Sequence, residues 1–157
     1  MSDILEQSHH CFIGSCRNYC AWIESDRKIK SEGYLLYLQK LLLDLYVQAL
    51  YLEKNDEISH KNFSSELDPV QLNLITNRTS ENIGEHQCYW TTFDPTENVF
   101  GNEAAMMGDL LDDVMDIYKD VKRKLMTYDL GTKESMQDAL WGMKFDFWHH
   151  WSCHAVD

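Results

Sequence analysis

The segment YLLYLQKLLLDLYVQALYL, residues 34–52, constrains the fold of this chain more than any other stretch. It contains neither proline nor glycine, and leucine and tyrosine cover nearly the whole circumference of a helix built from it. A helix that is apolar on all sides is usually buried by its neighbours. The segment therefore predicts a helix at the centre of a helical bundle.

The whole chain has the composition of one compact domain. It has 157 residues, 44% of them hydrophobic, with only seven glycines and two prolines. This length allows a core to form without disulfides or metal, and the scarcity of Gly and Pro favours long helices. We expect residues 1–157 to form a single helical domain.

The first half is predicted to hold two long helices followed by an irregular connection. Residues 3–24 carry apolar side chains at steps of three, four and seven, as a helix with one buried face does. Residues 53–101 are polar and turn-rich, although Asp68-Pro69 could open a short helix. We expect ordered loops with one or two short helices there, with the aromatic Trp90 buried.

The second half predicts two more long helices. The third is expected from the N-cap Asn102 to about residue 129, with Gly131 at its end, and the fourth from the N-cap Thr132 to the end of the chain. Their short connection makes them antiparallel neighbours. The fold class is therefore an all-α bundle of about four long helices, with a long connection between the second and third. The expected buried stripes include Met107, Val114, Val121 and Leu125 in the third helix, and Leu140, Met143, Phe147 and Trp151 in the fourth.

The charge of the chain excludes one class of partner and favours another. With 26 acidic against 14 basic residues, the net charge is −12. Such a chain repels nucleic acid and attracts a basic protein. The sequence shows neither a signal peptide nor an apolar run long enough to span a membrane, so we expect a cytoplasmic protein.

Cysteine usage fits the same compartment. The five cysteines are odd in number and form no CxxC pair, so neither a disulfide framework nor a zinc ribbon is indicated. We expect reduced thiols that are mostly buried.

The closing segment KFDFWHHWSCHAVD contains three histidines. At helical spacing, His150 and His154 lie in one row beside the core stripe, whereas His149 points away. Histidines four residues apart can both reach one metal ion, as in zincin helices, but here no glutamate stands between them. The spacing alone is a weak indication of a metal site.

The third helix provides possible partners for these histidines. Asp109, Asp113, Asp116 and Asp120 share one flank at steps of four, three and four. Facing an antiparallel histidine helix, they could form a metal site or an acid–base pair. The competing interpretation is purely structural, with the histidines hydrogen-bonded to Asp113 or Asp116 at the edge of the core.

The stretches YWTTFDPTE, GDLLDDVMDIYKDVKRKLMTYD and ALWGMKFDFWHHWSCHAVD resemble a bacterial family called domain of unknown function 5063. The resemblance lies mainly in the second half and implies an all-helical cytoplasmic protein without an assigned activity. Ser152 stands where that pattern has glycine, and the chain stops before its final apolar turn. The positions that match the pattern of the family are Asp112, Asp113, Asp116, His150, Trp151, His154 and Ala155.

Three functional hypotheses follow. The first is an acidic module that docks on a basic protein, as an immunity protein neutralises a toxin nuclease, without a cofactor and without a recognisable catalytic motif. The second is an enzyme that depends on a divalent metal, with His150 and His154 as ligands and Asp113 or Asp116 completing the site. The third is a structural or regulatory subunit with an exposed apolar patch. The docking contacts expected for the first are Asp109, Asp112, Asp113 and Asp116.

Overall fold

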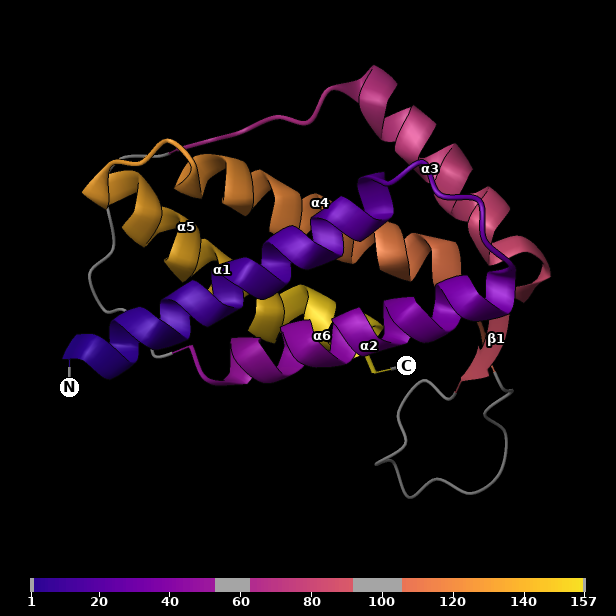
Figure 1. The fold of residues 1–157 in the computed structure, drawn as a ribbon, viewed down its shortest axis with the longest axis horizontal. Coiled ribbons are helices and arrows are strands. Elements are labelled where there is room, and N and C mark those ends of the chain that lie inside the picture. The colour runs from indigo at the N-terminus through magenta and orange to yellow at the C-terminus, as the bar shows by residue number, and fades with distance from the viewer. Residues whose placement is uncertain (1, 53–62, 92–105, 157) are drawn as a thin grey trace.

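The computed structural model describes residues 2–52, 63–91 and 106–156, and it is an all-α bundle (Figure 1). Helix α1 packs against α2 on one side and α4 on the other, α5 lies alongside α4, and α3 contacts both α2 and α4. The all-α class predicted from the sequence is confirmed. The long helices of the described residues are α1 (Ser2–Glu24), α2 (Ser31–Leu50), α3 (Pro69–Ile83), α4 (Leu110–Tyr128) and α5 (Lys133–Asp146).

Shorter elements lie before α4 and after α5. Strands β1 (Cys88–Thr91) and β2 (Met106–Asp109) pair antiparallel directly before α4. The 3-10 turn η1 (Gly84–His86) links α3 to β1. After α5 the chain continues as one π-helical turn, η2 (Phe147–Trp151), and a last α-helical turn, α6 (Ser152–His154).

One hydrophobic cluster joins the long helices. The predicted stripes of the first, third and fourth helices supply most of its fully buried side chains. Leu110 and Met136 of these stripes are only half-buried. Burial of large apolar side chains in one cluster is the main stabilising term for a domain of this size. The members from these stripes include Phe12, Tyr19, Ile23, Val114, Ile117, Val121, Leu125, Met143, Phe147 and Trp151.

Local signals at the helix ends hold as predicted. The Asp68 side chain accepts a hydrogen bond from the Val70 backbone N–H, and Pro69 opens α3. Thr132 caps α5 in a capping box with Ser135. Gly131 adopts φ 73°, a backbone conformation that favours glycine after a helix end.

The start of the third long helix was predicted wrongly. Helix α4 begins at Leu110 and its N-cap is Asp109; Met107 lies instead in β2 with its side chain 65% exposed. The predicted cap Asn102 lies outside the described residues. Pairing with β1 holds residues 106–109 extended, and this long-range contact overrides the helical spacing of their apolar side chains.

Strand β1 also differs from the predicted loop. Successive side chains of a strand point to opposite faces, so Tyr89 and Trp90 cannot both face the bundle. Tyr89 is half-buried, whereas Trp90 is 75% exposed, in contrast to its expected burial.

Helix α2 lies at the edge of the bundle (Figure 1) and not at its centre, which corrects the prediction from its all-round apolar surface. One face is buried through Tyr34, Leu38, Leu41, Leu45 and Ala49. The opposite face carries large apolar side chains that no described element covers.

The described residues form no helix with the length and hydropathy needed to cross a membrane. Their cysteines are all free thiols, and the expectation that most are buried was wrong. Cys16 and Cys20 lie in the core, but Cys11, Cys88 and Cys153 are exposed. Burial raises the pKa of Cys20 to about 12 and that of Cys16 well above its usual value, so neither forms a thiolate near neutral pH.

We therefore expect brief alkylation of the native protein to modify three thiols, at Cys11, Cys88 and Cys153. The two core thiols should react only in guanidinium chloride, where all five become accessible. Intact-mass spectrometry followed by peptide mapping measures both results. Rapid native modification of Cys16 or Cys20 would contradict the packing of α1 described here.

Candidate functional site

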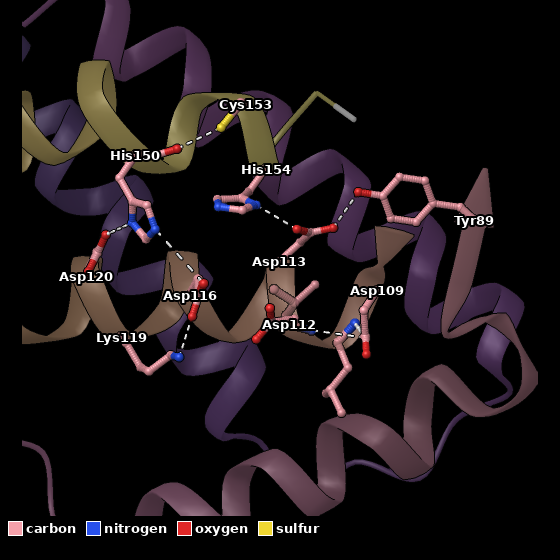
Figure 2. Close-up of polar contacts among 12 residues, drawn as sticks. Tyr89, Asp109, Asp112, Asp113, Asp116, Lys119, Asp120, His150, Cys153 and His154 are labelled. Carbon is pink, nitrogen blue, oxygen red and sulfur yellow. Dashed lines mark hydrogen bonds and ion pairs between the residues drawn. The ribbon is translucent and has the colours of Figure 1, made fainter. Parts of the chain in front are cut away.

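The acidic flank of α4 faces the C-terminal turns of the chain (Figure 2). Asp109, Asp113, Asp116 and Asp120 are spaced so that their side chains follow one side of the helix. The Asp109 carboxylate caps the helix by accepting the backbone N–H groups of Leu111 and Asp112, at 2.9 Å and 3.2 Å. The remaining three carboxylates are thus free to meet the segment that packs antiparallel to α4.

The π-helical turn η2 presents the histidines to this flank. Its wider turn, closed by the hydrogen bond from the Ser152 N–H to the Phe147 carbonyl, keeps both Phe147 and Trp151 fully buried. His150 and His154 lie on the α4 side, with ring centroids 5.2 Å apart, whereas His149 packs on Phe145. Single π-helical turns within α-helices are frequent at functional sites.

A separate carboxylate orients each of the two histidines. The Nδ1 atom of His150 lies 2.6 Å from Asp120 Oδ2, and Nδ1 of His154 lies 2.6 Å from Asp113 Oδ1 (Figure 2). A carboxylate accepts the proton of Nδ1, so the neutral imidazole keeps a lone pair on Nε2. This arrangement leaves both Nε2 atoms as potential ligands.

Asp113 is itself held from a third element. The Tyr89 hydroxyl of β1 donates to Asp113 Oδ2 at 2.6 Å, and Asp113 is only 9% exposed. In the hairpin register Tyr89 pairs with Gly108, and its ring covers this glycine so closely that a Cβ there would lie 2.4 Å from a ring carbon. Gly108 therefore lets the tyrosine reach across β2 to the first turn of α4.

Three potential ligand atoms meet between α4 and the C-terminal turns. One ligand atom from each of Asp116, His150 and His154 lies within 4.8 Å of the other two, and His150 Nε2 is 4.0 Å from Asp116 Oδ2. Ligands around a tetrahedral ion at 2.0–2.1 Å lie about 3.3 Å from one another. Small side-chain rotations would therefore close this cluster, which we call the Asp–His cluster, around one ion.

The cluster is partly open to solvent and lies among negatively charged side chains. The exposed fractions of the side chains are 47% for His150, 24% for His154 and 22% for Asp116. The hydrogen bond to Asp120 raises the pKa of His150, although desolvation opposes it, and burial raises the pKa of the nearby Asp146 carboxyl. Lys119 forms an ion pair with Asp116 and compensates part of the negative charge.

The three residues predicted as metal ligands, Asp116, His150 and His154, thus come together. Of the predicted docking contacts, Asp112 is exposed, whereas Asp113 is buried and Asp109 caps α4. The sequence pattern places Asp120 on the acidic flank, but Asp120 was not predicted as a site residue. Its spacing of four residues from Asp116 was the signal that could have indicated its role. Tyr89 was missed as a site residue because nothing in the sequence predicted the hairpin.

Fold and site together define a small all-helical protein with an Asp–His cluster between α4 and its C-terminal turns. The chain belongs to the family described as domain of unknown function (DUF5063), whose model matches residues 3–157. The match thus covers essentially the whole chain and not mainly its second half.

A solved structure shares this fold. Protein BF1032 from Bacteroides fragilis is similar with a TM-score of 0.80 at 20% sequence identity, covering 98% of this chain and 88% of that one. At this identity the likeness concerns the fold alone. No protein with a curated description matches the chain.

We expect Tyr89→Phe to lower the free energy of unfolding by about 2 kcal/mol, because it leaves the buried Asp113 carboxylate without one charge-assisted hydrogen bond. Urea unfolding followed by circular dichroism measures the change. Tyr51→Phe, at a tyrosine that is 68% exposed, is the matched control and should change stability by less than about 0.5 kcal/mol. Equal effects of the two variants would show that the contact with Asp113 contributes nothing.

Proposed function

We propose that this protein binds a divalent transition-metal ion through Asp116, His150 and His154. The observation that carries the proposal is the convergence of their ligand atoms within 4.8 Å, from two segments far apart in the sequence. Two imidazoles and one carboxylate suit Zn²⁺, Fe²⁺, Co²⁺ or Ni²⁺ better than Mg²⁺ or Ca²⁺, which prefer oxygen ligands.

The hydrogen bonds around the cluster support this assignment. Histidines that ligate metals almost always donate their second ring N–H to a carboxylate or carbonyl, which fixes the tautomer and raises the basicity of the ligand. Asp120 and Asp113 occupy those positions for His150 and His154. The Asp116 carboxylate beside both histidines adds a potential ligand that neither histidine needs for its own orientation.

The chemistry of the site follows from its number of ligands. Three protein ligands leave at least one coordination position for water or a substrate, as in catalytic zinc sites. A bound ion there would polarise that ligand and lower the pKa of a bound water. Lys119 forms an ion pair with Asp116, and this ion pair would have to break when a cation binds the carboxylate. We therefore favour a metal-dependent enzyme over a structural metal site.

Docking on a basic protein, for example a toxin, stays a prediction that rests on the net charge of −12 and on the exposed Asp112. Asp109, Asp113 and Asp116 already have partners within the chain, so neutralising them would cost those contacts. We place the protein in the cytoplasm because its three exposed thiols are unpaired, and such thiols persist in a reducing compartment.

We expect tag-free protein to retain one transition-metal ion per chain after loading with Zn²⁺ or Co²⁺ and dialysis. His150→Ala and His154→Ala should each abolish retention, whereas His149→Ala, at the histidine that packs on Phe145, should leave it unchanged. Elemental analysis by mass spectrometry measures the stoichiometry.

A second readout separates loss of metal from loss of structure. Zn²⁺ at about 100 times its Kd should stabilise the wild type by about 2.7 kcal/mol, and the two ligand variants should gain nothing. Metal contents that are equal in the His149→Ala and His150→Ala variants would overturn the proposal.

A further inference from the structure

The outer face of α2 carries a row of large exposed apolar side chains. While one face of the helix is buried in the core, Leu36, Leu43, Val47 and Leu50 on the other are 71%, 57%, 44% and 46% exposed. A row of exposed apolar side chains on one helix face is typical of a site of protein–protein contact. This face explains why the segment reads as apolar all round although α2 lies at the edge of the bundle (Figure 1).

The spacing of these residues is that of a coiled coil. Together with Lys40 they recur at steps of four, three, four and three, with leucine at each d position and Lys40 and Val47 at the a positions. We call Leu36, Lys40, Leu43, Val47 and Leu50 the α2 seam. A seam with this repeat packs best against another helix that carries the same repeat, and one charged residue at an a position restricts the partner and the register.

We propose that the α2 seam pairs two copies of this chain in antiparallel orientation. Leu36 and Leu50 lie seven residues on either side of Leu43, so a two-fold axis there places Leu36 opposite Leu50 of the second copy, and the reverse. Such an isologous contact closes on itself and yields a dimer.

Charge complementarity favours the second copy as the partner. At a net charge of −12, most of the surface repels another copy, but the seam carries no acidic side chain and one lysine. In the antiparallel register Lys40 comes within reach of Asp44 of the other copy, twice by symmetry; Asp44 is exposed, and its Oδ2 accepts a hydrogen bond from the Ser15 hydroxyl of its own chain. A parallel pair would instead stack Lys40 on its own counterpart.

The size of the seam sets the strength of the contact. From Leu36 to Leu50 it is about 21 Å long, at 1.5 Å per residue, and Tyr37 and Tyr51 border it with 44% and 68% of their surface exposed. Two heptads flanked by aromatic residues correspond to the lower end of specific interfaces. The dimer should therefore dissociate on dilution, and the contact is independent of the Asp–His cluster.

Sedimentation velocity of tag-free protein across a concentration series tests the proposal. The wild type should shift toward twice the 18.5 kDa chain mass as concentration rises. Leu43→Glu places two carboxylates at the two-fold axis and should weaken association at least tenfold. Leu130→Glu is the matched control, since Leu130 is 59% exposed after α4, and should associate as the wild type does.

A variant that associates more tightly separates an effect on the interface from a loss of folding, because an unfolded protein could not gain affinity. Lys40→Leu completes the apolar seam and should tighten association at least tenfold. A wild type that stays monomeric across the whole concentration series, or a Leu43→Glu variant that associates like the wild type, would overturn the proposal.

The orientation can be tested separately, with Cys11, Cys88 and Cys153 changed to serine. In that background, oxidation of a mixture of the Leu36→Cys and Leu50→Cys chains should give a covalent dimer containing one of each. The Leu36→Cys chain alone should give none. Ready cross-linking of Leu36→Cys to itself would show a parallel pair and overturn the antiparallel arrangement.

Discussion

Burial of the apolar stripe of α4 is the constraint on which the rest of the structure depends. Val114, Ile117, Val121 and Leu125 are almost fully buried, and α4 contacts α1, α3, α5 and the C-terminal turns. Once this stripe faces the core, the helical period fixes the directions in which the other side chains of α4 point. The aspartates of the same helix must then lie along its edge, where the chain returns antiparallel through α5 and η2.

The Asp–His cluster is a consequence of that edge. Asp113 accepts from Tyr89 and pairs with His154, so one buried carboxylate joins β1, α4 and α6. Asp120 orients His150 in the same way from the next turns of α4. A binding site is most effective when its ligands are already held by such surrounding contacts, because less ordering remains to be done on binding. The hairpin, which contributes little to the core, therefore matters chiefly as the support of Asp113.

The apolar residues of helix α2 lie on two different faces of the helix. Its inner face joins the core through residues such as Leu38 and Leu45, and its outer face repeats apolar residues at coiled-coil spacing. A helix buried only by its own chain would not need the second face. The outer face and the Asp–His cluster are built from different helices, so a change in either can be studied without disturbing the other.

The sequence by itself determined the all-α class, the helices α1 and α2 to within a few residues, the start of α5, and the Asp68 and Thr132 caps. It also placed His150 and His154 in one row, but it left open whether Asp113 or Asp116 joins them. These features follow from local periodicity and capping, which depend on residues close together in the chain. Only the tertiary structure decided that residues 106–109 pair as a strand, that Tyr89 supports Asp113, and that α2 lies at the edge. Each of these depends on contacts between segments far apart in sequence, and such contacts override local propensity without leaving a local signal.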